Sequence, residues 1–139
     1  RILRALEVYG TTGKPFSSYR KAARRQRPFN ILKIGIAMPR DTLYNRINLR
    51  VDEMIRQGLT DEVNTLLPYR YYNALNTVGY SEIFDYLDGK TDLQTAIELI
   101  KQNTRRFAKR QLTWFNKDKT ITWLPAEAIV GFVNGQLQS

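Results

Sequence analysis

The segment 91–115, TDLQTAIELIKQNTRRFAKRQLTWF, constrains the fold of this chain more than any other stretch. Its apolar residues recur every three or four positions, which is the period of an α-helix with one buried side. The pattern therefore predicts the longest helix of the chain. The side that we expect to be buried consists of Leu93, Ala96, Ile97, Ile100, Thr104, Phe107, Ala108, Gln111 and Phe115.

The opposite half of this predicted helix is strongly basic, with cations at Lys101, Arg105, Arg106, Lys109 and Arg110. Like charges four residues apart destabilise a helix by roughly a few tenths of a kcal/mol per pair. Arg105/Lys109 and Arg106/Arg110 are such pairs, so we expect an anion from outside the helix. A solvated basic face would explain the same charges. The second half, however, has almost no compensating acid and includes Trp114, and cations beside rings are typical of RNA contact.

The composition excludes several classes of site. The 139 residues contain no cysteine and no histidine, which removes disulfides, thiolate or histidine zinc sites, and the Ser/His/Asp triad. The formal net charge is +9, from 22 Lys and Arg against 13 Asp and Glu. Such a charge favours nucleic acid as the partner, with an anionic membrane surface second, although a basic surface can also serve solubility alone.

Shorter patterns predict the other elements and together indicate a mainly α fold with one or two short strands. We expect helices at 1–10, 41–58, 60–67, 81–90 and 126–138, and strands at 31–38 and 120–124. Gly10, Gly58 and Gly89 are expected to end helices, and Ser81 to cap one. The basic run 17–27, with Ser17 or Ser18 as cap, is either a solvated arm or a phosphate-contacting segment.

Three arginines lie on or just before the predicted helix 41–58. Arg40 follows a strand and precedes a helix, the position where α/β folds bind ligands. Arg46 and Arg50 are four residues apart and share a helix face. These arginines could bind phosphate or pyrophosphate, and ion pairing with Asp41 or Asp52 is an equally good explanation.

Recognisable phosphate and metal motifs are missing from the sequence. No GxxxxGK[ST] loop occurs, and the similar stretch at 10–14 follows a helix and precedes a proline. Asp85, Asp88 and Asp92 flank a turn without calcium-loop spacing, so no metal ligands are predicted in this chain. The segment NTVGY (76–80) could bring backbone close to a ligand, but a turn into the next helix explains it better.

Four ordered motifs together resemble one family. They are RILRALEVYGTTGKPFS (1–17), AMPRDTLYNRINLRVDEMIRQGLTDEV (37–63), NTVGYSEIFDYLDG (76–89) and IKQNTRRFAKRQLTWF (100–115). They are similar to motifs of the tRNA dimethylallyltransferases, also called tRNA isopentenyltransferases. The resemblance covers residues 1 to about 124.

The resemblance implies a tRNA-modifying enzyme. Family members transfer a dimethylallyl group from dimethylallyl diphosphate to N6 of the adenosine 3′ to the anticodon, with Mg²⁺ as cofactor. Their fold is a P-loop α/β core with a helical insertion, and their phosphate loop and general base lie in the amino-terminal half. This chain resembles the carboxyl-terminal part, and it begins in mid-helix, so we expect a fragment that is inactive alone and has no catalytic residue or magnesium ligand of its own.

The same resemblance assigns residues to ligands and divides the chain. Residues 1–30 would form the end of the helical insertion and a basic connector. Residues 31–124 would belong to the transferase core, and residues 125–139 would form a terminal helix or tail. Arg40, Arg46 and Arg50 would bind the diphosphate. The anticodon stem-loop would be contacted by Arg1, Arg4, Asn76, Thr77, Val78, Gly79, Tyr80, Ser81, Arg105, Arg106, Lys109, Arg110, Gln111, Thr113, Trp114, Phe115 and Asn116.

Two interpretations of the sequence remain open. The first is part of a cytoplasmic tRNA prenyltransferase, monomeric and independent of membranes. The second is a non-enzymatic helical module that binds RNA or DNA. A phosphate loop encoded upstream of Arg1 would favour the first, and its absence the second.

Overall fold

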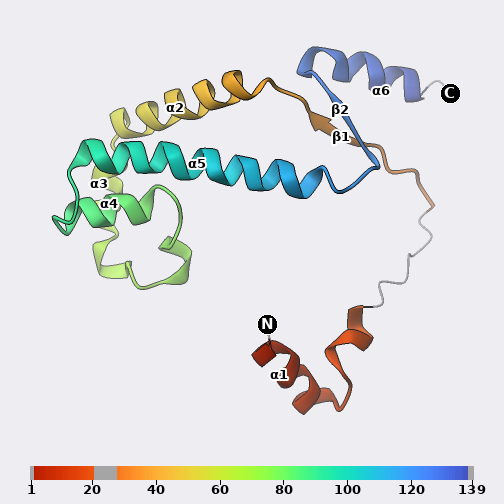
Figure 1. Cartoon of the computed structure of the whole chain (residues 1–139), viewed down its shortest axis with the longest axis horizontal. Coiled ribbons are helices and arrows are strands. Elements are labelled where there is room, and N and C mark those ends of the chain that lie inside the picture. Colours follow the sequence, from red (N-terminus) through yellow and green to blue (C-terminus); the bar gives the residue numbers. More distant parts are fainter. Residues whose placement is uncertain (1, 21–27, 138–139) are drawn as a thin grey trace. The chain divides into compact units, whose positions relative to one another are not determined.

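The computed structural model describes residues 2–20 and 28–137. The chain divides into two compact units, Arg1–Ile31 and Leu32–Ser139. The described parts are mainly helical with two short strands, as the sequence predicts (Figure 1).

The first unit contains α1 (Ile2–Thr12) and the 3₁₀ turn η1 (Phe16–Arg20). The predicted helix end at Gly10 is wrong. The helix continues to Thr12 and stops before Gly13, whose left-handed φ of +66° ends it, whereas Gly10 keeps a helical backbone. Ser18 does not cap a helix here, since its Oγ donates a hydrogen bond to the Pro15 carbonyl at 2.8 Å. The basic residues of 21–27 lie outside the described residues.

The second unit carries the remaining elements. They are β1 (Lys33–Ile36), α2 (Arg40–Arg56), α3 (Leu59–Thr65), η2 (Leu67–Tyr69), η3 (Asn73–Leu75), α4 (Tyr80–Leu87), α5 (Leu93–Phe115), β2 (Ile121–Leu124), η4 (Ala126–Ala128) and α6 (Ile129–Leu137). The predicted strands and the terminal helix are confirmed, with β1 shorter than expected. The separation of 125–139 as a tail stays a prediction.

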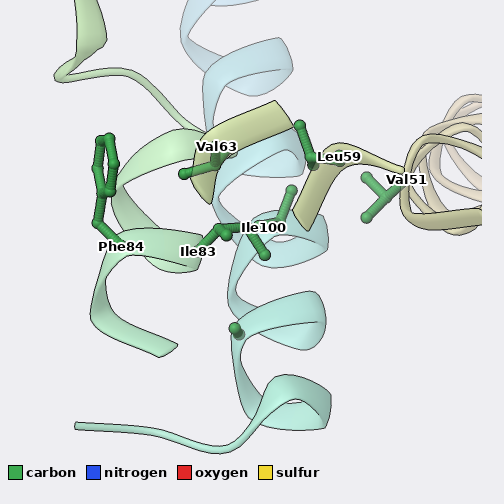
Figure 2. Packing of buried hydrophobic residues seen from close by; sticks show 7 residues of the cluster. Val51, Leu59, Val63, Ile83, Phe84 and Ile100 are labelled. Carbon is green, nitrogen blue, oxygen red and sulfur yellow. The ribbon is translucent and has the colours of Figure 1, made fainter. Parts of the chain in front are cut away.

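The core of the second unit lies where α2, α3, α4 and the first half of α5 meet (Figure 2). Apolar side chains from all four helices converge there, which removes them from water and fixes the helices against one another. The buried cluster consists of Val51, Leu59, Val63, Ile83, Phe84, Ala96 and Ile100. This packing makes α5 a rigid support beyond the cluster.

The two strands form a parallel pair in which Lys33 aligns with Ile121 and Ile36 with Leu124. Gly35 is required in β1 because a Cβ there would come within 2.5 Å of the Trp123 ring. This two-stranded sheet connects the start of α2 to the end of α5 (Figure 1).

Several helix boundaries differ from the predicted ones because backbone caps decide them. Gly58, with φ +96°, ends the α2 segment as predicted, but α3 starts at Leu59 and ends at Thr65, before Pro68. The predicted cap at Ser81 is wrong, since α4 begins at Tyr80 after Gly79. α5 begins at Leu93, where the Asp92 carboxylate accepts the Thr95 N–H at 2.8 Å; this bond and one from the Thr95 hydroxyl lower the pKa of Asp92.

The predicted buried stripe of α5 is only half correct. Ala96 and Ile100 are buried, whereas Phe107, Gln111 and Phe115 are exposed. The reason is that the packed cluster ends near Ile100 and the helix continues past it. The second half of α5 therefore presents rings and cations at the surface.

Candidate nucleic-acid interface

The first two cations on α5, Lys101 and Arg105, contact side chains of the second unit. Lys101 Nζ lies 2.8 Å from Asp52 of α2 and 3.2 Å from Glu98, and its side chain is 13% exposed. The hydrogen bond to Asp52 raises the pKa of Lys101. Arg105 Nη1 donates to Asn48 Oδ1, also on α2, at 2.7 Å. The fold itself thus provides the anion for Lys101, and it directs Arg105 toward α2.

The last part of the basic run remains on the surface. Arg106, Lys109 and Arg110 are exposed, and at 100° per residue they lie on one side of α5. The Arg110 guanidinium lies 5.7 Å from the Phe107 ring centroid, and Trp114 is 68% exposed. Within residues 2–20 and 28–137, none of the three cations forms an ion pair. We call these five residues the outer basic face.

The other four predicted RNA contacts at the end of α5 are not part of the outer basic face. They are Gln111, Thr113, Phe115 and Asn116. Gln111 and Phe115 line an apolar groove of about 680 Å³ beside β1 and β2. The Thr113 hydroxyl donates to the Lys109 carbonyl at 2.9 Å, so its hydrogen is used within the helix. Asn116 is the residue at the end of α5. These side chains extend the surface around the outer basic face without adding charge.

The turn before α4 presents part of its predicted contact set. Asn76, Thr77 and Val78 are exposed, whereas Gly79 is buried. Gly79 has φ +105°, a conformation that favours glycine. The Gly79 N–H donates to Glu82 Oε2 at 2.8 Å, which closes the turn onto α4.

Two polar contacts hold the residues that follow this turn. The Tyr80 hydroxyl donates to Glu62 Oε1 of α3, and this hydrogen bond raises the pKa of Tyr80. The Ser81 hydroxyl donates to Asn76 Oδ1 at 3.4 Å. Tyr80 and Ser81 therefore support the shape of the turn, whereas the residues before Gly79 are exposed at its surface.

Arg40 lies at a small hollow between the start of α2 and the end of α5. The hollow has a volume of about 210 Å³ and is lined by Met38, Arg40, Leu43, Tyr44, Lys109, Leu112, Thr113 and Asn116. The Arg40 guanidinium lies 5.0 Å from the Tyr44 ring centroid. In the part of the chain that the structure describes, neither Arg40 nor Lys109 has an ion-pair partner. Two cations at one hollow are suited to binding an anion.

The structure does not bring the three predicted diphosphate ligands together. Arg46 lines the apolar groove rather than the hollow, and its Nη1 lies 3.9 Å from the Met38 sulfur. Arg50 is exposed one turn further along α2. At a rise of about 1.5 Å per residue, Arg46 and Arg50 lie about 9 and 15 Å further along α2 than Arg40.

The predicted contacts of the first unit are described separately. Arg4 is exposed on α1, with its Nη1 3.3 Å from a Glu7 carboxylate oxygen. An exposed ion pair of this kind contributes at most about 1 kcal/mol, so Arg4 can exchange Glu7 for another anion. Arg1 lies outside the described residues.

The part of the chain that the structure describes contains no cluster of metal-binding side chains. Over residues 2–20 and 28–137, no group of three or more His, Cys, Asp and Glu side chains could hold a metal ion. We therefore assign no step to Mg²⁺ in this chain. In addition, none of the described helices combines the length and the apolar composition needed to cross a membrane.

Sequence reasoning missed three polar residues that organise this surface. Glu62 and Glu82 hold the turn, and Asn103 of α5 donates to Glu82 Oε1 at 2.7 Å. Glu82 stands three residues after Gly79, the spacing of a capping box, and this signal could have revealed it. The partners of Glu62 and Asn103 are distant in sequence and follow only from the packing of the helices.

A family model and several curated proteins match the sequence of this chain. The family model described as IPP transferase matches residues 1–118. The tRNA dimethylallyltransferase of Cytophaga hutchinsonii is 50% identical, over 99% of this chain and 46% of the relative. That of Christiangramia forsetii is 57% identical, over 88% of this chain and 41% of the relative.

A solved structure adds a comparison of the fold. The tRNA delta(2)-isopentenylpyrophosphate transferase of Staphylococcus epidermidis has a TM-score of 0.74 and 36% identity, over 99% of this chain and 48% of that chain. This chain thus spans less than half the length of the relatives it matches. The family model nevertheless covers most of its residues, so the expected relationship is confirmed: the chain belongs to the IPP transferase family.

Proposed function

We propose that this chain is the RNA-facing part of a tRNA prenyltransferase. The reaction is the transfer of a dimethylallyl group from its diphosphate to N6 of the adenosine 3′ to the anticodon. The names of the relatives support this activity, since they are tRNA dimethylallyltransferases. The observation that carries the role of this chain is the outer basic face, where three cations, which have no carboxylate partner among the described residues, lie beside two exposed rings.

The outer basic face suits a looped RNA better than a small anion. Arg106, Lys109 and Arg110 can each meet a phosphate of the backbone, and Trp114 offers a flat surface to an unpaired base. Asn76 and Thr77, exposed in the turn before α4, can add polar contacts. We assign the anticodon stem-loop as the ligand of this surface.

The Arg40 hollow is assigned to the diphosphate end of the reaction. In the displacement, the adenine amine forms a C–N bond with the dimethylallyl group, while the bond from carbon to the diphosphate oxygen breaks. The electron pair of that bond leaves with the diphosphate, and a cation near the leaving group stabilises the developing charge. Arg40 is the residue we assign to this role, and Lys109, which also lines the hollow, stays assigned to the RNA backbone. The base that accepts the amine proton is not among the residues we assign.

Binding of a labelled anticodon stem-loop across a salt series tests this proposal. The slope of log K against log salt concentration, the salt slope, counts the phosphates that the protein contacts. Each contact steepens it by about 0.7 units on a single strand and by about 0.9 units on a duplex. Lys109→Ala combined with Arg110→Ala should therefore weaken binding and reduce the slope by about 1.4 to 1.8 units. An unchanged slope would remove the outer basic face from the interface.

A control with the same loss of charge separates local contact from net charge. Arg56→Ala combined with Lys90→Ala removes two exposed cations that pair with nearby carboxylates and do not belong to the outer basic face. This variant should keep the wild-type slope. A second RNA, with the adenosines after the anticodon replaced, tests specificity. Equal binding of both RNAs would mean that this part of the enzyme supplies a basic surface and that adenosine specificity resides in the other half.

A further inference from the structure

Glu82 is a buried carboxylate whose partners connect the turn before α4 to α5. Its side chain belongs to a residue that is 8% exposed, and a charge so placed is costly unless hydrogen bonds satisfy it. Glu82 Oε2 accepts the Gly79 N–H at 2.8 Å, and Oε1 accepts the Asn103 side-chain amide at 2.7 Å. One carboxylate therefore holds the turn and a side chain of α5 at the same time.

The carboxylate of Glu82 also determines which way the Asn103 amide points. An ionised carboxylate only accepts hydrogen bonds, so the Asn103 NH₂ group must face Glu82 and its oxygen must face away. That oxygen, Oδ1, accepts a hydrogen bond from Arg106 Nη1 at 3.3 Å. The turn, Glu82, Asn103 and Arg106 thus form one continuous hydrogen-bonded series.

We propose that Asn103 is a positioning residue for RNA binding, which holds the Arg106 guanidinium toward a phosphate of the looped RNA. This inference rests on the proposed function. Arg106 is exposed and has no carboxylate partner among the described residues, so its other N–H groups are available to a phosphate. Holding a long side chain in one orientation before binding reduces the entropy that binding must remove.

A double-mutant cycle on stem-loop binding tests the proposal. Asn103→Ala should weaken binding about fivefold, the effect of one hydrogen bond, and Arg106→Ala should weaken it and lower the salt slope by about 0.7 to 0.9 units. In the Arg106→Ala background, Asn103→Ala should change affinity by less than about twofold, because its effect passes through Arg106. Gln94→Ala, another amide removed from α5, is the control and should leave binding unchanged.

Thermal unfolding distinguishes positioning from a structural role. Asn103→Ala should lower stability mainly through its lost hydrogen bond to Glu82, so most of that loss should persist without Arg106, whereas the loss of affinity should require Arg106. Glu82→Gln provides a second variant of nearly the same shape. If the oxygen of the glutamine at position 82 still accepts the Gly79 N–H, the NH₂ group of that glutamine faces Asn103. The Asn103 amide must then turn so that its oxygen accepts from the glutamine. Its own NH₂ group, a donor, would then face the N–H donors of Arg106. This variant should weaken binding as Asn103→Ala does.

Each outcome supports or overturns the inference. An equal loss of affinity from Asn103→Ala in both backgrounds, or no loss in either, would overturn it. If Arg106→Ala has no effect while the wild-type chain binds, the inference fails and the proposed function stands. If the wild-type chain does not bind the stem-loop, both fail.

Discussion

Ile100→Ala is the substitution expected to damage the fold of the second unit most directly. Ile100 lies on α5 among side chains from α2, α3 and α4 and is 2% exposed (Figure 2). Because α5 carries the outer basic face, its packing at Ile100 determines whether that surface is held in place. The variant should be measured by urea denaturation followed by circular dichroism.

The expected magnitude follows from the atoms removed. Three carbons leave a fully buried position, and at about 0.8 kcal/mol each the transfer term is about 2.4 kcal/mol. The neighbours cannot close the space completely, since they belong to four separate helices, and a residual cavity adds to the loss. The free energy of unfolding should therefore fall by about 2 to 5 kcal/mol.

Leu99→Ala is the matched control, because Leu99 precedes Ile100 on the same helix and is 36% exposed. It should lower the free energy of unfolding by clearly less. Equal losses for the two variants, or a loss below about 1 kcal/mol for Ile100→Ala, would show that the four-helix cluster is not the core that supports α5.

Two further substitutions test other parts of the second unit. Gly35→Ala should lower the free energy of unfolding by about 1 to 3 kcal/mol in urea denaturation, because the added Cβ meets the rigid Trp123 ring; wild-type stability would show that β1 and β2 do not pair closely. Asp88→Asn should lower the melting temperature at pH 7. Arg70 and Lys90 hold the pKa of Asp88 below its ordinary value, so their stabilisation is present above the unfolded pKa near about 4 and is lost as pH falls. The difference in melting temperature should shrink between about pH 5 and pH 2, and a difference independent of pH would contradict this assignment.

The sequence predicted the elements of this fold better than their ends. Periodicity placed α2 and α5 correctly because it reports the buried side of each helix directly. The ends depend on single backbone conformations and caps, so the choice of Ser81 over Gly79 was wrong. The predicted buried stripe of α5 is too long, since periodicity continues through Phe107 and Phe115 although both side chains are exposed in the second unit as the structure describes it.

The sequence indicates which residues form the candidate surface, but not which partners hold their side chains. The charge of Arg106, Lys109 and Arg110 is visible in the sequence, and the resemblance assigned it to RNA. The division of labour along α5 is not visible, because Asp52 and Asn48 reach the helix only through tertiary packing. The same holds for Glu82 and Asn103, whose hydrogen bond joins residues of two helices.

This division explains why repelling cations remain on one short stretch of α5. Arg105 donates a hydrogen bond to the Asn48 amide of α2, which turns that guanidinium toward α2 but does not neutralise the Arg105/Lys109 pair. The Arg106/Arg110 pair meets only an amide and a ring among the described residues, so its repulsion persists in the folded chain. Proteins keep such locally unfavourable features mainly where function requires them. An RNA phosphate would neutralise this pair, and binding would then remove the repulsion that folding leaves on the outer basic face.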